Sequence, residues 1–260
     1  MTKPLVIAHR GSSEQHPEHT LRAYEQAVTD GADGVECDVR LSADGHLVCV
    51  HDRTLDRTST GKGVVSQLSL EQLRAFDWGS WKGEEHTAEV LTLRALIESL
   101  AAAPRKVQLV VETKHPARQS AEIERSLARL LAEYDLLDPE TAPLQVRLMS
   151  FSSLAVGRFA KLMPRLERVQ LIEGVQLPRF RNSLATGVKI AGPGIAILRR
   201  DRDFVARHHA HGNQVHVWTV DSPEDIALCL ALGVDAIISN RPAVVRKAVD
   251  EAVDEAAGDA

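Results

Sequence analysis

The sequence predicts an α/β protein that folds as a (β/α)8 TIM barrel, and three observations support this prediction. Short apolar runs rich in Val and Ile alternate with longer amphipathic stretches along nearly the whole chain. This alternation is typical of parallel sheets, in which a helix connects each strand to the next. Eight such strands in a chain of 260 residues favour a closed barrel over an open sheet.

The predicted elements follow one another without an internal repeat. The apolar runs predict strands at 5–8, 35–41, 108–113, 146–150, 168–172, 187–191, 214–220 and 235–238. The amphipathic stretches predict helices at 20–30, 92–102, 119–133, 152–162, 201–210, 223–232 and 242–252. Thr20 and Ser222 are suitable N-caps, and Pro223 suits a first helical position. Residues 174–186 contain Pro178 and mixed charges, so we expect a short or irregular helix there.

The chain departs from this alternation after the second predicted strand. Asp44-Gly45 predicts a hairpin turn, so 47–51 should return antiparallel to that strand. A loop-rich stretch and a short helix capped by Ser69 follow. We expect residues 52–91 to form a small insertion on the face where barrel enzymes carry their functional loops.

The charge of the chain is concentrated at its C-terminal end. Residues 250–260 carry five of the 36 acids and no base, so 31 acids remain against 31 Lys and Arg. We therefore predict a single domain over 1–249 and an acidic tail over 250–260 that frays in solvent. A body without basic excess argues against nucleic acid as a partner.

Two further features bear on location. No apolar run reaches the roughly 18 residues that span a bilayer, and residues 1–4 lead into the first strand without a signal-peptide core. Cys37, Cys49 and Cys229 are odd in number and lack metal-site spacing, which favours reduced, buried thiols. We expect a cytoplasmic protein without a stable membrane anchor; its oligomeric state stays open.

Three carboxylates lie on two predicted strands that should be neighbours. Glu36 and Asp38 point to the same face because side chains alternate along a strand, and Glu112 lies on the next barrel strand. Ionised groups in such apolar strands are costly unless something pairs with them. One divalent cation would satisfy all three, and ligands with oxygen only suit Mg²⁺ or Ca²⁺. The alternative is a structural ion cluster with Arg10 and Lys114.

Two histidines accompany these acids. His9 directly follows the first predicted strand, and His51 ends the hairpin strand. A lone histidine at a strand end is more often a core or rim residue, but two beside three acids favour proton transfer near neutral pH. Four other histidines, His208, His209, His211 and His216, lack a closed ligand set, and we expect them to be solvent-exposed.

Six motifs in order make the chain resemble the glycerophosphodiester phosphodiesterases, of the bacterial, cytoplasmic type, over about residues 5–242. The motifs are His9-Arg10-Gly11, Pro17-Glu18-His19-Thr20, Glu36-Cys37-Asp38, His51-Asp52, Glu112-Thr113-Lys114 and Trp218-Thr219-Val220. The resemblance implies a phospholipase-C-like phosphodiesterase barrel with its insertion at 52–91. It also implies metal-dependent hydrolysis of a small-molecule glycerophosphodiester to sn-glycerol 3-phosphate and an alcohol.

A phosphodiester substrate suggests roles for the histidines and the two cations. His9 and His51 would flank the scissile phosphate as general base and general acid, in that order. Arg10 and Lys114 suit the non-bridging oxygens, the first as a bidentate fork and the second as a point charge.

Two substrate-binding candidates and three departures from the family pattern remain. Glu18 would orient Arg10 or contact glycerol hydroxyls, unless it is an ordinary helix-entry acid. Trp218 would form an apolar wall for the glycerol carbons, unless it only packs in the barrel. His19 replaces an Asn and should alter hydrogen bonding near the site, whereas Asp221 and Asn240 should affect rim contacts more than chemistry.

Three rival functions use the same barrel. One is a lysophospholipase D-like or other phospholipid phosphodiesterase, and the second is a non-enzymatic barrel that senses phosphodiesters. The third is an unrelated metal-dependent activity, against which the six ordered motifs argue. The insertion at 52–91 and the absence of a membrane-docking stretch in the sequence favour the soluble substrate. The head group, the choice between Mg²⁺ and Ca²⁺, and attack by water or by the glycerol 2-hydroxyl stay open.

Overall fold

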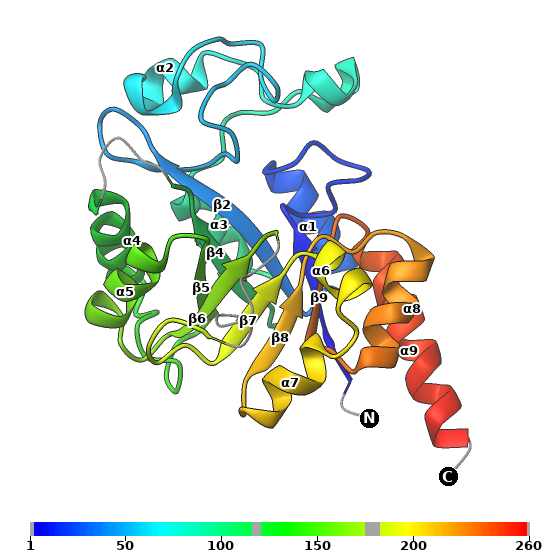
Figure 1. The fold of residues 1–260 in the computed structure, drawn as a ribbon. Coiled ribbons are helices and arrows are strands. Elements are labelled where there is room, and N and C mark those ends of the chain that lie inside the picture. The colour runs from blue at the N-terminus through cyan, green and yellow to red at the C-terminus, as the bar shows by residue number, and fades with distance from the viewer. Residues whose placement is uncertain (1–2, 116–120, 175–182, 259–260) are drawn as a thin grey trace.

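A closed barrel of eight parallel strands forms the centre of the protein, as predicted (Figure 1). The computed structural model describes residues 3–115, 121–174 and 183–258. The strands are β1 (Leu5–His9), β2 (Gly34–Leu41), β4 (Gln108–Thr113), β5 (Gln145–Ser150), β6 (Glu167–Ile172), β7 (Ile190–Pro193), β8 (Gln214–Val217) and β9 (Ala236–Ser239). β1 pairs with both β2 and β9, which closes the sheet.

Helices cover the outside of the barrel (Figure 1). They are α1 (Leu21–Thr29), α3 (Leu93–Ala101), α4 (Glu122–Glu133), α5 (Ser153–Leu162), α6 (Ile195–Arg200), α7 (Phe204–Ala210), α8 (Pro223–Leu232) and α9 (Pro242–Gly258). The predicted caps are present: Thr20 accepts a hydrogen bond from the Ala23 amide, and Ser222 accepts one from the Asp225 amide. Helix starts were therefore readable from local chemistry.

Several elements in the second half differ from the prediction, and β8 ends at Val217 rather than at residue 220. The helix predicted at 201–210 is preceded by a separate helix, α6, because Asp201 has a non-helical backbone that ends the first helix before α7 begins. The strand predicted at 187–191 begins three residues later, because Gly187 has a positive φ and lies in a turn. Residues 175–182 of the predicted irregular segment lie outside the described residues.

The predicted fraying of the acidic tail is wrong as far as residue 258. Helix α9 continues through Gly258 and projects beyond the barrel (Figure 1). Asp250 bonds Lys3 at 2.7 Å and Arg246 at 3.0 Å, so the start of the tail is tied to the barrel. Alanine-rich sequence favours helix as well.

The insertion forms a small lobe above the barrel (Figure 1). β3 (Leu47–Cys49) pairs antiparallel with β2, as the Asp44-Gly45 turn predicted, and α2 (Leu70–Arg74) follows. Three short 3-10 helices complete the lobe: η1 (Val65–Gln67), η2 (Ser80–Lys82) and η3 (Glu84–His86). The lobe has its own apolar cluster, in which Leu73 and Trp78 are buried. It is therefore a packed unit rather than an open loop.

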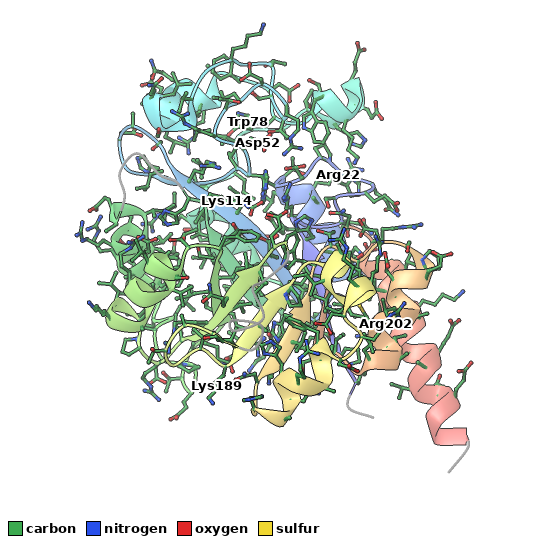
Figure 2. All side chains as sticks on the ribbon, viewed as in Figure 1. Arg22, Asp52, Trp78, Lys114, Lys189 and Arg202 are labelled. Carbon is green, nitrogen blue, oxygen red and sulfur yellow. The ribbon has the colours of Figure 1, made fainter. Side chains whose placement is uncertain are left out.

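The figures place the lobe at one end of the barrel. In Figure 2, Lys114 lies at the barrel end beneath the lobe that carries Asp52 and Trp78, and Lys189 lies at the opposite end. Among the described residues, no helix combines the length and the apolar character needed to cross a bilayer. Cys37, Cys49 and Cys229 are buried free thiols, as predicted.

The predicted exposure of four histidines is wrong for two of them. His208 is buried and packs on Phe204 with ring centroids 4.4 Å apart. His216 is buried on β8 within the barrel sheet. His209 and His211 are exposed, as expected, and His209 pairs with Asp235 at 2.8 Å. The linear spacing of histidines did not show which of them the barrel encloses.

We expect the lobe to contribute to global stability through its own core. Leu73→Ala removes a fully buried side chain and should lower the free energy of unfolding by about 2–5 kcal/mol. Leu154→Ala is the matched control, because Leu154 is 76% exposed and should change stability by less than about 0.5 kcal/mol. Urea unfolding of both variants measures the difference. Equal stability of the two variants would contradict a packed lobe.

Burial of His216 should make the protein sensitive to acid. Burial, together with the charge of Arg147, lowers the pKa of His216 to about 3. Above the unfolded-state pKa of about 6.5 neither state gains a proton at His216. Below it only the unfolded state does, so the free energy of unfolding decreases as the pH is lowered. Between pH 7.5 and pH 5, wild type should lose about 2 kcal/mol more than His216→Leu in urea unfolding. Parallel pH dependence of the two proteins would contradict this.

Candidate active site

Strand register brings the predicted acids and His9 to one end of the barrel. In the parallel pairings, Glu36 of β2 lies opposite His9 of β1. Asp38 of β2 lies opposite Glu112 of β4. The carboxyl ends of barrel strands meet at one face, which is where barrel active sites form. Residues distant in sequence therefore converge there because of strand pairing alone.

The turn after β1 has an unusual backbone. Arg10 has φ 60° and Gly11 has φ 87°, both in the left-handed region. A Cβ at position 11 would lie 2.6 Å from the carbonyl carbon of Ala23, so only glycine fits against α1 there. The His-Arg-Gly motif thus encodes a sharp turn that carries Arg10 toward the second strand.

Glu36, Asp38 and Glu112 form a compact buried acidic group. Ligand oxygens of the three side chains lie within 4.8 Å of one another. Burial and the neighbouring Asp38 charge raise the pKa of Glu112 to about 8, and the same two causes raise the pKa of Glu36. Like charges held together in a buried site favour a bound cation. This oxygen-only donor set could hold one metal ion.

The two predicted cations already contact the acidic group. Arg10 Nε lies 2.8 Å from Asp38 Oδ2, and Lys114 Nζ lies 3.0 Å from Asp38 Oδ1. Lys114 also pairs with Glu112 at 2.9 Å. Although burial opposes ionisation, the charges of Arg10 and Lys114 hold the pKa of Asp38 well below its usual range.

The ion-cluster alternative therefore describes part of the site. No ion pair among the described residues reaches Glu36, whose carboxylate accepts the Arg10 amide at 3.2 Å. Three carboxylates face two cations, so positive charge is short, and the raised pKa values of Glu36 and Glu112 reflect this shortage. A divalent cation fits such a site better than a closed set of ion pairs.

His19, which replaces the usual Asn, is a third partner of Asp38. Its Nε2 lies 3.0 Å from Asp38 Oδ2, and its Nδ1 lies 2.8 Å from the Tyr24 hydroxyl. Tyr24 in turn donates to the Glu36 carbonyl at 3.2 Å. His19 thus takes part directly in the hydrogen bonding of the acidic group.

His9 is held by Asn240 and Asp221, the two residues that we expect from the sequence to affect rim contacts more than chemistry. Asn240 Nδ2 donates to Asp221 Oδ2 at 2.6 Å, which turns its Oδ1 toward His9 Nδ1 at 2.7 Å. Nδ1 therefore carries the proton, and Nε2 is the basic nitrogen. Burial, with the Arg10 charge, lowers the pKa of His9 to about 4. Asp221 and Asn240 thus determine which ring nitrogen of His9 carries the proton.

His51 has a different set of partners. Its Nδ1 lies 2.6 Å from Asp52 Oδ1, and its carbonyl accepts Nη2 of Arg40 at 2.7 Å. Burial and the charges of Arg10 and Lys114 lower the pKa of His51, while Asp38 and Asp52 oppose this. His51 is the more exposed of the two histidines at the site, with 34% of its side chain accessible.

Most of these side chains line one pocket with a volume of about 280 Å³. Of the nine predicted site residues, seven line it: His9, Arg10, Glu36, His51, Glu112, Lys114 and Trp218. Trp218 donates to the Gly192 carbonyl and packs edge-on against Phe151, with ring centroids 5.3 Å apart. Phe151 and Glu173 also line the pocket and were not predicted. Their one sequence signal is their position just after a barrel strand.

The other two predicted residues, Asp38 and Glu18, do not line the pocket but contact residues that do. Glu18 Oε1 accepts Arg10 Nη1 at 3.0 Å, and both Glu18 oxygens accept the guanidinium of Arg57. This geometry agrees with an orienting partner of Arg10. The sequence carried no signal for Arg57, which lies in the loop of the lobe.

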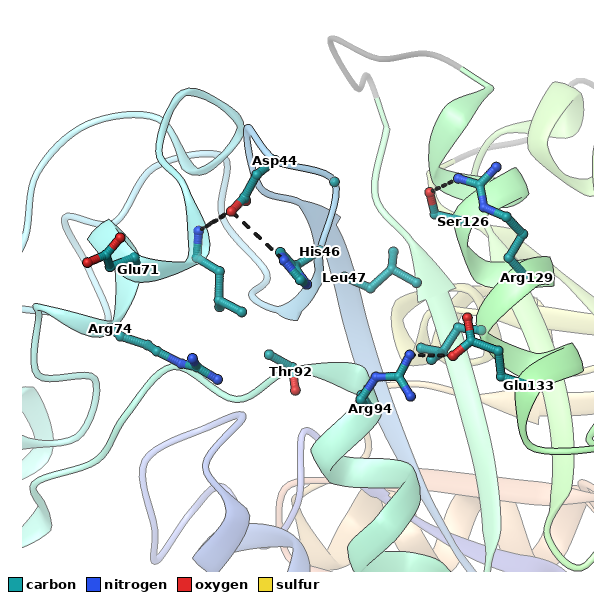
Figure 3. Close-up of a pocket in the computed structure, with 13 residues that line it drawn as sticks. Asp44, His46, Leu47, Glu71, Arg74, Thr92, Arg94, Ser126, Arg129 and Glu133 are labelled. Atoms are coloured by element: carbon teal, nitrogen blue, oxygen red, sulfur yellow. Dashed lines mark hydrogen bonds and ion pairs between the residues drawn. The ribbon is translucent and has the colours of Figure 1, made fainter.

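A larger hollow lies elsewhere, between the β2–β3 hairpin, α2, α3 and α4 (Figure 3). Its volume is about 530 Å³, and none of the predicted site residues lines it. Charged side chains of both signs line it, and Arg94 pairs with Glu133 there (Figure 3). Size alone therefore does not identify the active site.

Comparisons with known proteins identify relatives along nearly the whole chain. The chain is 43% identical over 249 residues to the probable glycerophosphodiester phosphodiesterase 1 of Mycobacterium tuberculosis, covering 92% of this chain and 90% of that relative. It is 32% identical over 253 residues to the glycerophosphodiester phosphodiesterase of Bacillus subtilis, covering 94% and 85%. The structure of an Oleispira antarctica phosphodiesterase in complex with the product sn-glycerol-3-phosphate superposes with a TM-score of 0.83 at 28% identity, covering 95% and 97%. The model of the glycerophosphoryl diester phosphodiesterase family matches residues 9–244, and this chain therefore belongs to that family.

Proposed function

We propose that the protein hydrolyses glycerophosphodiesters to sn-glycerol 3-phosphate and an alcohol in a metal-dependent reaction. The observation that carries this proposal is the pocket in which two histidines, two cations and a buried acidic group converge. The names of its relatives support the substrate class, and so does the product bound to the Oleispira antarctica structure.

Glu36, Asp38 and Glu112 would hold one divalent cation, Mg²⁺ or Ca²⁺. When bound, that ion would polarise the phosphoryl group and lower the pKa of the attacking hydroxyl. Lys114 bridges Asp38 and Glu112, so it would hold both carboxylates in place while its ammonium faces the pocket.

Arg10 and Lys114 would bind the non-bridging oxygens of the phosphate. Both line the pocket, and both are anchored on their far side by carboxylates, Arg10 by Glu18 and Asp38, and Lys114 by Asp38 and Glu112. Anchored cations aimed at developing charge need little reorganisation in the transition state. Trp218 would form the apolar wall for the glycerol carbons.

The two histidines suit opposite roles in proton transfer. His9, with a pKa lowered to about 4 by burial and the Arg10 charge, is neutral near pH 7, and its Nε2 would accept a proton from the attacking hydroxyl. His51 would protonate the leaving alkoxide. The Asp52 carboxylate favours its charged form, and an anionic phosphate between Arg10 and Lys114 would offset the charges that lower its pKa.

Removing the metal should abolish the reaction. We expect release of glycerol 3-phosphate from glycerophosphocholine to stop in EDTA and to return when Mg²⁺ or Ca²⁺ is added back. Glu112→Gln keeps the shape of the side chain but removes a charge, so it should require more metal for half-maximal recovery. Release that EDTA leaves unchanged would contradict a metal at Glu36, Asp38 and Glu112.

Lysophosphatidylcholine assayed in parallel distinguishes the proposed activity from a phospholipid phosphodiesterase. Faster turnover of lysophosphatidylcholine than of glycerophosphocholine would favour the phospholipid phosphodiesterase.

Loss of the His51 imidazole should slow turnover without loosening the metal. His51→Ala should lower turnover of glycerophosphocholine by at least about 100-fold, the usual size of a general acid contribution. Metal affinity, measured by calorimetry, should stay near that of wild type. His46→Ala is the matched control, because His46 is 55% exposed and lies by the larger hollow. Near-normal turnover of His51→Ala would refute its role.

A further inference from the structure

One arginine of the inserted lobe connects the two sides of the site. Arg57 donates from Nη1 and Nη2 to the two oxygens of Glu18, at 2.7 and 2.8 Å. Its Nε donates to Asp52 Oδ2 at 2.6 Å. The guanidinium therefore bridges a carboxylate of the barrel and a carboxylate of the lobe.

Each of these two carboxylates also contacts a residue that lines the pocket. The second oxygen of Asp52 lies 2.6 Å from His51 Nδ1. Glu18 Oε1 accepts Arg10 Nη1 at 3.0 Å. An unbroken chain of short polar contacts thus runs from His51 through Arg57 to Arg10.

We propose that Arg57 is a positioning residue that fixes His51 and Arg10 relative to each other. This inference rests on the proposed function, in which His51 donates a proton and Arg10 binds the phosphate. Arg57 touches neither residue and acts through Asp52 and Glu18. Because His51 enters from the lobe side and Arg10 from the first barrel strand, their spacing depends on a bridge of this kind.

The charge state of the bridge supports this role. Burial alone would raise the pKa of Glu18, but hydrogen bonding to Arg57 and the charge of Arg10 lower it to about 2. The same opposition holds for Asp52, whose pKa the hydrogen bonds from Arg57 and His51 lower despite burial. Both groups are therefore acceptors at neutral pH. An ionised Asp52 holds one proton of His51 on Nδ1, so that Nε2 is the nitrogen that takes up and donates the second proton when the imidazole is charged.

The bridge requires arginine rather than positive charge alone. Three nitrogens of one planar group are used at once, two on Glu18 and one on Asp52. A lysine ammonium in that place is a point charge on a flexible stem and cannot reproduce this fork. Arg57→Lys therefore keeps the positive charge but removes the planar group that makes the three hydrogen bonds at once.

Docking of the lobe does not depend on Arg57 alone. Lys82 Nζ donates to the Ser13 carbonyl at 2.7 Å, and the lobe has its own apolar core around Leu73. Lys82→Ala loosens that second attachment without touching the bridge. It is therefore the control for a merely structural role.

The test uses the full chain with saturating metal and glycerophosphocholine. Arg57→Ala and Arg57→Lys should each lower kcat/KM by roughly 10- to 100-fold, the usual cost of removing a residue that orients functional groups. Lys82→Ala, and Arg74→Ala on the exposed side of α2, should stay within about twofold of wild type. Combining Arg57→Ala with Asp52→Asn should cost less than the product of the two single losses.

A second readout does not depend on turnover. Histidine ¹⁵N chemical shifts should show the Nδ1–H form of His51 in wild type and in Lys82→Ala, but a mixture of tautomers in Arg57→Lys. Unchanged tautomer and kcat/KM in Arg57→Lys would overturn the inference, and so would equal losses in Lys82→Ala. Wild type without phosphodiesterase activity would overturn the proposed function instead, and the tautomer measurement would still decide whether Arg57 positions His51.

Discussion

The cost of burying three carboxylates at one end of the barrel governs the rest of this site. Glu36, Asp38 and Glu112 are each less than a tenth exposed, and ionised groups so placed must be compensated. Asp38 bears most of that compensation, because Arg10, Lys114 and His19 all contact it. Glu36 has no ion-pair partner among the described residues, and this shortage of positive charge makes the site suitable for a divalent cation.

The same principle extends outward in successive layers. The two histidines that line the pocket are each held by a hydrogen-bonding partner. Asn240 and Asp221 hold His9, and Asp52 holds His51. Outside these, Arg57 ties the lobe to the first barrel loop. The lobe therefore contributes to the site through electrostatic contacts.

The departures from the family pattern have structural meaning in this chain. His19 occupies a left-handed backbone position with φ 61°, a conformation in which Asn, Asp and His are enriched among residues other than glycine. The imidazole reaches both Asp38 and Tyr24 from there, and its two ring nitrogens bond in opposite directions. The pair at 221 and 240 likewise acts together, because Asp221 orients the amide that meets His9.

The sequence by itself determined the barrel, the antiparallel hairpin, the lobe and most pocket residues. These follow from local signals: strand and helix periodicity, cap residues, a turn dipeptide, and short motifs at strand ends. It could not show that Arg57 reaches Glu18, 39 residues away, or that Asn240 meets His9, 231 residues away. It also missed the burial of His208 and His216 and the helical tail. Only the tertiary structure decided these features, because barrel closure and lobe docking, rather than local sequence, bring such distant residues into contact.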